Sequence, residues 1–245
     1  MKADPTDQQR LLELQALDTR LDQLDHQLRS LPEHAELAAL TARAGDVDAE
    51  VVRTTTARGD VQRELVKAEQ DVQLVRDRAA RDQQRLDSGA GSAKDMQALQ
   101  HEIESLARRQ STLEDEELEV MERAEALDAE VARAQADQEA LAAETAEVTR
   151  SRDAKAGALE ADRAEVAGGR EAIVADISAE LLALYDKIRA QSGTGAAPLQ
   201  QRRCGGCQLE LNNVDLARMR AAADDEVLRC EECRRILVRT PESGL

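Results

Sequence analysis

Leucine recurs at alternating steps of three and four residues near the start of the sequence, and this spacing constrains the fold more than any other feature. Side chains spaced in this way lie on one stripe of a helix, and a second helix must cover that stripe. Pro32 follows the run and predicts a break near residue 32. The repeat therefore predicts a coiled coil, built first on Leu14, Leu17, Leu21, Leu24, Leu28 and Leu31.

The same ladder of apolar residues resumes in shifted phase after Pro32 and again after a glycine-rich segment. Residues 87–92 are the strongest turn signal in the first half, and Ser92 with Asp95 resembles a capping box that opens the next helix. We expect the chain to reverse there and to form an antiparallel hairpin over residues 1–192. The second long helix should continue until residues 192–195. Pro32 and Gly168-Gly169 are weak points, for which local fraying and a hinge both remain open.

Aromatic residues are almost absent, since Tyr185 is the only one. A globular core of this size would use several, whereas paired long helices bury only narrow stripes. The chain also carries a formal charge of -17, whereas a typical nucleic-acid binder has a surplus of basic residues. No apolar run approaches the roughly 20 residues of a membrane span, and the start of the sequence has no signal-peptide pattern. We expect a cytoplasmic protein with no membrane association.

Four cysteines form two Cys-x-x-Cys pairs near the C-terminus: Cys204 and Cys207, then Cys230 and Cys233. This pattern predicts one structural Zn²⁺ held by four thiolates, within a zinc ribbon at residues 196–245 that has two or three strands and one helix. A four-thiolate shell has no open position for substrate, which argues against metal catalysis. A reducing compartment disfavours disulfides, and thiol redox chemistry is the remaining alternative for the pairs.

No set of residues at catalytic spacing is visible, and His26, His34 and His101 are scattered along polar helical stretches. The sequence therefore predicts a protein that is not an enzyme. An alternative is RNA or DNA binding, in which ribbon arginines contact phosphates, although the ribbon lacks an aromatic residue for base stacking. The arginines in question are Arg202, Arg203, Arg229, Arg234, Arg235 and Arg239.

Residues 94–103, 184–189, 204–207 and 230–237 together resemble segments of a bacterial family. Its members combine a coiled-coil hairpin with a C-terminal four-cysteine zinc ribbon. The resemblance implies an adaptor or chaperone of flagellar and type III secretion systems, which binds an alternative sigma factor, export components or messenger RNA. The sequence departs from the family pattern at Arg234, where glycine often follows the last cysteine.

These features together predict a mostly α fold and a non-catalytic, zinc-binding adaptor or chaperone-like protein with protein partners. The start of the second long helix is a candidate docking surface, formed by Lys94, Gln97, Gln100 and His101. The apolar stripes can be covered within one hairpin or between two chains, so a homo-oligomer remains open.

Overall fold

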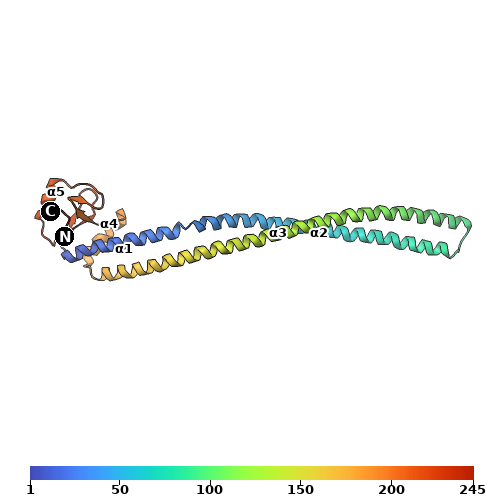
Figure 1. Ribbon diagram of the computed structural model, residues 1–245, viewed down its shortest axis with the longest axis horizontal. Helices are drawn as coiled ribbons and strands as arrows, with labels where there is room; N and C mark the ends of the chain where they lie inside the picture. Colours follow the sequence, from blue (N-terminus) through green and yellow to red (C-terminus); the bar gives the residue numbers. More distant parts are fainter. The chain divides into compact units, whose positions relative to one another are not determined.

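The computed structural model describes residues 1–245, and most of them are helical (Figure 1). The predicted fold class is confirmed: a long helical hairpin precedes a small strand region that carries the four cysteines. In chain order the elements are α1 (Pro5–Arg29), α2 (Pro32–Asp87), α3 (Ala93–Ala175), α4 (Ala179–Ser192), β1 (Ala196–Gln200), β2 (Arg203–Cys204), α5 (Asn213–Ala221), β3 (Leu228–Arg229) and β4 (Ile236–Arg239).

The chain divides into two compact units, of which the second comprises Ala35–Thr149. In this second unit α2 and α3 run antiparallel, and their apolar ladders meet. The side chains buried there are those of the predicted stripes, including Leu40, Thr54, Val61, Val72, Leu106, Leu113, Ala134, Leu141 and Val148. The predicted ladder is therefore confirmed by burial. A narrow stripe suffices because each helix of a coiled coil contacts only its partner.

The turn between α2 and α3 is built from local hydrogen bonds. Gly89 and Gly91 adopt φ values of 64° and 145°, which favour glycine. The backbone N–H of Ser92 donates to Asp95 Oδ2 at 2.9 Å, and the N–H of Asp95 donates to Ser92 Oγ at 3.3 Å. This reciprocal pair is a capping box that satisfies free donors at the start of α3.

The first unit comprises Met1–His34 and Arg150–Leu245. Asp4 caps α1, since its Oδ1 accepts from the N–H of Thr6 at 2.7 Å, and Pro5 occupies the first turn, where it displaces no hydrogen bond. At the other end, α1 ends at Arg29 and α2 begins at Pro32. A proline is tolerated in the first turn of a helix but not in its interior.

The second long helix ends earlier than the sequence predicted. The apolar spacing predicts one helix up to residues 192–195, but α3 ends at Ala175 and α4 begins at Ala179. The intervening turn is held by α1, because Asp7 accepts from the Ser178 N–H at 3.1 Å and Arg10 donates to the Asp176 carbonyl at 3.0 Å. These contacts join residues far apart in sequence, so helical periodicity alone does not indicate the turn.

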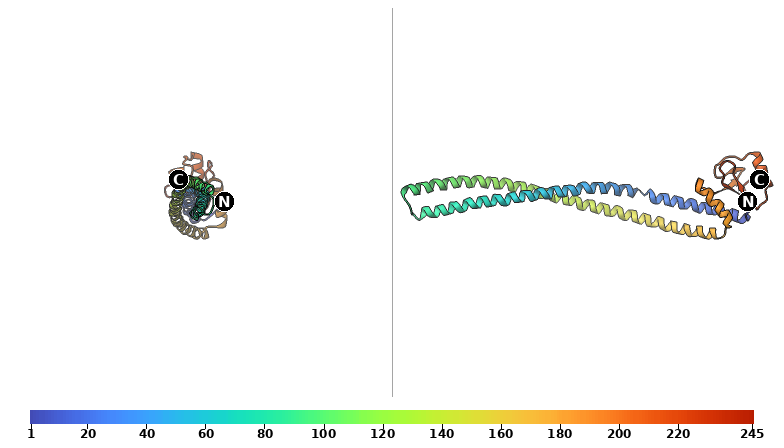
Figure 2. Two further views of the ribbon diagram at one scale, coloured as in Figure 1. Left: turned by 90° about the vertical axis from the view of Figure 1, so that its right-hand side faces the viewer. Right: turned by 180° about the vertical axis from the view of Figure 1, so that it is seen from behind.

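After this turn α4 lies beside α1 and runs parallel to it (Figure 2). Tyr185 is fully buried between them, and its hydroxyl donates to Asp18 Oδ2 at 2.7 Å. Asp18 is itself 1% exposed and also accepts from Arg170 Nε at 2.6 Å. Burial, together with the hydrogen bond to Asp18, raises the pKa of Tyr185. The network connects α1, α3 and α4 through one buried carboxylate.

The ribbon is a four-stranded sheet in the order β2-β1-β4-β3, rather than the two or three strands predicted. The additional strand is β1, which precedes the first cysteine pair and runs parallel to β4. Side chains of a strand alternate between the faces of the sheet. Ile236 and Val238 pack into a core with Leu11, Leu14, Leu181 and Tyr185, whereas Leu237 packs with α5 and the cysteines.

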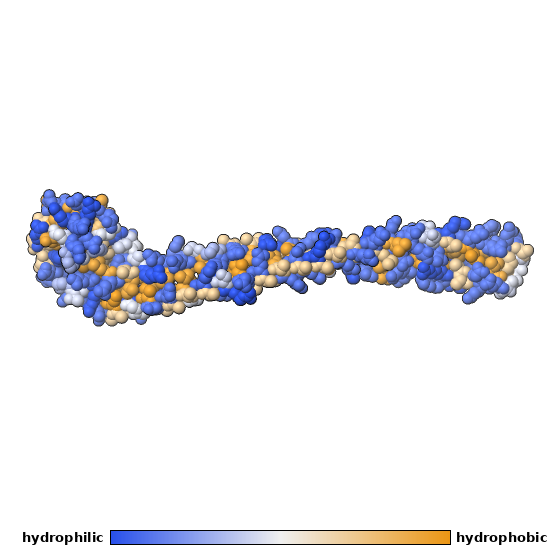
Figure 3. All heavy atoms as spheres, in the orientation of Figure 1, coloured by the Kyte–Doolittle hydropathy of each residue, from blue (hydrophilic) through white to orange (hydrophobic).

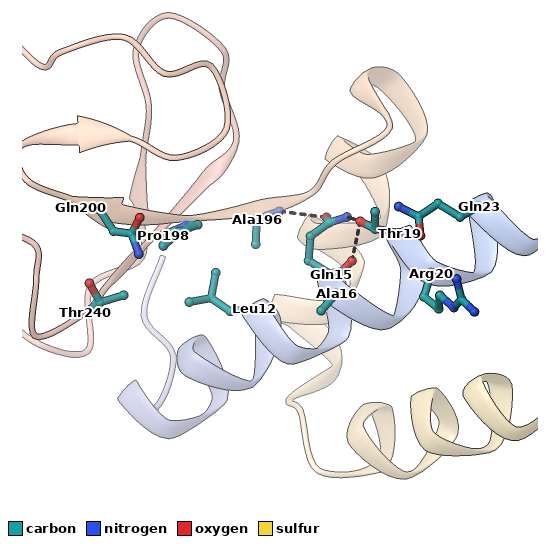
Figure 4. A pocket seen from close by; sticks show the side chains of 10 residues that line it. All are labelled: Leu12, Gln15, Ala16, Thr19, Arg20, Gln23, Ala196, Pro198, Gln200 and Thr240. Atoms are coloured by element: carbon teal, nitrogen blue, oxygen red, sulfur yellow. Dashed lines mark hydrogen bonds between the residues drawn. The ribbon is translucent and has the colours of Figure 1, made fainter.

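Residues at the start of the chain also lie against the ribbon. The N–H of Ala3 donates to the carbonyl of Asp225 at 2.8 Å, and the N–H of Val227 donates to the carbonyl of Met1 at 3.0 Å. Gln15 on α1 contacts the start of β1: its Oε1 accepts from the N–H of Gly195 at 2.7 Å and from that of Ala196 at 3.5 Å, the second of which is drawn in Figure 4. The ribbon sheet is thus anchored to α1 by hydrogen bonds as well as by a shared core.

Candidate metal centre

The four cysteine sulfurs lie around one point between two tight turns of the ribbon. We call these turns, residues 204–207 and 230–233, the first and second knuckle. All four Sγ atoms lie within 4.8 Å of one another. The Cys204 and Cys233 sulfurs are 3.7 Å apart, and the Cys207 and Cys230 sulfurs are 3.9 Å apart. A tetrahedron with metal–sulfur bonds of ~2.3 Å has edges of about 3.8 Å, whereas a disulfide bond is about 2.05 Å long. The geometry fits zinc and not disulfides.

Backbone N–H groups of each knuckle point at the first sulfur of its pair. Cys204 accepts from the N–H groups of Gly206 and Cys207, and Cys230 accepts from those of Glu232 and Cys233. These donors partly neutralise a thiolate and orient it. The two knuckles therefore repeat one local arrangement, and each supplies two ligands.

Burial opposes ionisation of these thiols when only protein groups are considered. It raises the pKa of Cys204 to about 12, against the opposing effect of the knuckle N–H groups, and it also raises the pKa of Cys230. Burial acts in the same direction on Cys233, but the N–H of Arg235 and hydrogen bonds from the other cysteines outweigh it and lower the pKa to about 7. A coordinated divalent cation removes this barrier, because it binds the deprotonated sulfur.

The first knuckle needs glycine because it lies directly against β1. A Cβ atom on Gly205 would be 2.8 Å from Pro198 Cγ, and one on Gly206 would be 3.1 Å from Ala197 Cβ, both on β1. The N–H of Gly205 donates to the Pro198 carbonyl at 2.8 Å. The glycines therefore allow the metal ligands to lie close against the sheet.

A non-glycine residue with positive φ follows each cysteine pair. Gln208 has φ 62° and Arg234 has φ 63°, and their N–H groups donate to the carbonyls of Cys204 and Cys230. This left-handed conformation costs roughly 1–2 kcal/mol for a residue with a Cβ atom. The hydrogen bonds of both knuckles hold it, so the departure from glycine at Arg234 does not alter the metal geometry.

The ribbon arginines differ in what they contact. Arg239 donates to four backbone carbonyls, those of Met219, Ala222, Asp224 and Glu226, at 3.1 to 3.4 Å. Arg235 donates to the carbonyls of Thr194 and Ser192 at 3.2 and 3.3 Å. Arg239 thus holds the end of α5 and the loop after it, and Arg235 holds the end of α4, roles that the spacing of arginines in the sequence does not reveal.

The remaining arginines are more exposed. Arg202 donates to Asn213 Oδ1 at 2.6 Å, and Arg203 lies 3.9 Å from Glu210. Arg229 donates from Nε to the carbonyl of Arg234, whose own side chain is exposed. Of the six arginines predicted as phosphate contacts, these four are exposed; Arg218 and Arg220 on α5 are exposed as well.

The other predicted residues belong to the second unit, whereas the cysteines belong to the first. Lys94, Gln97, Gln100 and His101 are exposed at the start of α3, and His101 Nδ1 is 3.9 Å from a Glu104 carboxylate oxygen. The structure brings them together on one helical segment, where they remain a predicted docking surface.

A groove of about 550 Å³ lies between α1 and β1 in the first unit (Figure 4). Leu12, Ala16, Ala196 and Pro198 provide apolar surface, and Gln15 bonds across one side. Its lining residues include no carboxylate, histidine or cysteine. The hydroxyls of Thr19 and Thr240 in the lining donate to backbone carbonyls, and no side chain of the usual general-base types lines the groove beside them. The groove therefore offers mainly surface for contact.

Comparison with known proteins assigns the chain to a family. The model of the CT398-like coiled coil hairpin domain matches residues 14–193, and that of the C4-type zinc ribbon domain matches residues 203–237. The chain belongs to the CT398-like hairpin family. The cysteine geometry and the ribbon match together identify the centre as that of one structural zinc ion. The predicted division into a hairpin domain of residues 1–192 and a ribbon domain of residues 196–245 stays a prediction.

Relatives span the whole length of the chain. The uncharacterized protein Rv2229c of Mycobacterium tuberculosis is 37% identical, and the alignment covers 98% of each chain. A solved structure from Mycobacterium smegmatis is 40% identical, with a TM-score of 0.83 over 98% of this chain and all of that one. CT398 from Chlamydia trachomatis shares 17% identity and a TM-score of 0.64 over 96% and 98% of the two chains, which shows the fold alone. No catalytic family is among these matches.

Proposed function

We propose that this protein is a non-catalytic, zinc-dependent adaptor or chaperone-like protein, in which a coiled-coil hairpin and a zinc ribbon serve macromolecular interactions. The observation that carries the proposal is the closed arrangement of the four sulfurs, in which all positions around a tetrahedral metal are taken by protein. A metal held in this way stabilises a surface and does not activate a substrate.

The packing of the ribbon supports the same role. Its sheet shares a core with α1 and α4, so one ordered surface includes strands, helices and the start of the hairpin.

A reducing compartment suits a centre of four thiolates, and none of the helices is long and apolar enough to span a membrane. We therefore propose that the protein acts in the cytoplasm. Self-association is an additional proposal, to be tested by light scattering.

Nucleic-acid binding is the second candidate, and the exposed arginines of the ribbon favour it. Arg202, Arg203, Arg229 and Arg234 are accessible, whereas Arg235 and Arg239 donate to backbone carbonyls. The formal charge of -17 opposes the binding of a polyanion. Titration of RNA and DNA at low salt tests this candidate. Binding that a variant with Arg203→Gln and Arg234→Gln loses would favour it over the adaptor.

The adaptor proposal is tested by purifying the zinc-loaded full chain with its bound proteins after nuclease treatment. We expect a protein partner that binds saturably. Replacing Cys230 and Cys233 with serine should abolish this binding, because the ribbon surface is then disordered. Capture that depends entirely on nucleic acid would contradict the proposal, as would turnover of a substrate that requires the cysteines.

A further inference from the structure

One solvent-facing stripe of α3 combines exposed apolar side chains with carboxylates. Leu118 is 56% exposed and Met121 is 40% exposed, although both are large apolar residues on a helix whose buried stripe lies elsewhere. They are separated by one helical turn, so they are neighbours on the surface. Asp115 and Glu122 lie three and four positions from Leu118, Glu125 lies four positions from Met121, and all three carboxylates are exposed. The five residues, called here the α3 face, therefore form one continuous strip.

The α3 face is not used within the protein. The core between α2 and α3 is formed by other positions of the helix, such as Leu113. Asp115, Glu122 and Glu125 make no ion pair or side-chain hydrogen bond, in contrast to Glu114 nearby, which binds Arg76 at 2.5 Å, and Asp128, which binds Arg58 at 2.8 Å. The strip thus has apolar surface and negative charge that the fold leaves without partners. Figure 3 shows that hydrophobic residues reach the surface of the helices among hydrophilic ones.

The charge around this strip is strongly one-sided. Within residues 114–130 only Arg123 is basic, and it binds Glu64 on α2 at 2.8 Å. The nine acidic residues of the same segment are Glu114, Asp115, Glu116, Glu117, Glu119, Glu122, Glu125, Asp128 and Glu130. A partner that covers the apolar pair must therefore bring positive charge to its rim.

We propose that the α3 face is the docking surface for a basic amphipathic helix of a protein partner. This inference rests on the proposed adaptor function and specifies its partner chemistry. An amphipathic helix presents apolar residues at spacings of three and four, which match Leu118 and Met121, and lysine or arginine beside them can pair with the three free carboxylates. The partner helix would lie along α3 as an additional helix of the coiled coil.

A second copy of the chain is a poor occupant of the same face. Two identical α3 faces would bring carboxylates of the same sign together, and like charges across an interface cost affinity. The excess of acidic over basic residues in the chain as a whole gives the same result at longer range. Charge thus selects a different, basic partner.

The test uses the zinc-loaded full chain and a synthetic helical peptide of leucine and lysine, with leucines spaced by three and four. A scrambled peptide of the same composition keeps the charge but loses the apolar stripe. Fluorescence anisotropy should show saturable, one-to-one binding of the amphipathic peptide that is at least about tenfold tighter than binding of the scrambled one. Equal affinity for the two peptides would overturn the proposal, because it would indicate attraction by charge alone.

Variants locate the binding. Replacing Leu118 and Met121 with glutamine should weaken binding of the amphipathic peptide by about tenfold or more. Replacing Val52 and Leu74 instead removes two exposed apolar side chains that are not neighbours, and it should leave the affinity unchanged. Neutralising Asp115, Glu122 and Glu125 to their amides should reduce the salt dependence. An equal loss in the control variant, or light scattering that shows self-association through Leu118 and Met121, would overturn the proposal.

The proposals on the partner and on the adaptor function can fail separately. If the Leu118→Gln and Met121→Gln chain still captures its native protein partner with full affinity, the α3 face is not the docking surface, but the adaptor function stands. If the chain has no protein partner, the adaptor function itself is wrong.

Discussion

Replacing Asp18 with asparagine should lower the free energy of unfolding of the first unit by about 3 kcal/mol. Asp18 is buried and accepts from Arg170 at 2.6 Å and from Tyr185 at 2.7 Å, while Arg189 Nε lies 3.4 Å away. A hydrogen bond to a charged group contributes roughly 1.5–3 kcal/mol. We take the lower end for each of the two bonds, because the side chains of Arg170 and Arg189 are 28% exposed and water can replace part of the loss.

Tyr185 provides the assay, because it is the only aromatic residue and lies within the affected network. Its near-ultraviolet circular dichroism and fluorescence report unfolding of this site during urea titration, whereas the helices of both units dominate the far-ultraviolet signal. The midpoint of the transition seen through Tyr185 should fall in the variant. Its denaturant slope should be unchanged, which would show that stability alone has altered.

Asp22→Asn is the matched control. Asp22 lies one turn further along α1 and binds Arg189 at 2.8 Å, but its side chain is 57% exposed. An exposed ion pair contributes little, so this substitution should have a much smaller effect. If Asp18→Asn destabilises the protein no more than Asp22→Asn does, the assignment of Asp18 as the buried centre of the network is wrong.

Three further predictions concern Arg239, the Gly168-Gly169 pair and Glu33. Arg239→Ala removes a donor from four carbonyls around the end of α5, so limited proteolysis should cut residues 219–227 faster; an unchanged cleavage rate would refute this role. Gly168→Ala with Gly169→Ala should raise the free energy of unfolding by about 2 kcal/mol, because an added Cβ meets nothing within 4 Å at Gly168 and only Leu17 at 3.8 Å at Gly169; a fall in the urea midpoint would contradict it. The bond from Lys155, aided by Ser151, lowers the pKa of Glu33, so its stabilising effect is present above about pH 5 and is lost as the pH falls through the lowered pKa. The difference in melting temperature between the parent chain and Glu33→Gln should therefore shrink in acid, and a difference that is constant with pH would exclude this linkage.

The hairpin could be predicted because its determinants are local and repetitive. Leucine and valine at steps of three and four define the buried stripe, and Ser92 with Asp95 marks the start of α3. The four metal ligands could be predicted equally well, since two Cys-x-x-Cys pairs have few functions other than metal binding in such a sequence. Both the hairpin and the metal site are encoded in the spacing of residues close together in the sequence, which can be read without knowing the fold.

Other features depend on contacts between distant residues and left little trace in the sequence. The turn before α4 is held by Asp7 and Arg10, although Ile177 and Leu182 on either side of Ser178 have the spacing of a hydrophobic staple and could have indicated it. The role of Arg239 requires four loop carbonyls to converge, which no pattern encodes. The sequence does not reveal the α3 face, because Leu118 and Met121 lie outside the repeat that defines the core.

The zinc centre is central to this account, and X-ray absorption spectroscopy combined with elemental analysis of the purified full chain tests it most directly. We predict one zinc ion per chain and a shell of four sulfur ligands at ~2.3 Å, with no nitrogen or oxygen ligand. A chain without stoichiometric metal, a shell with fewer than four sulfurs, or cysteines recovered as disulfides would contradict it.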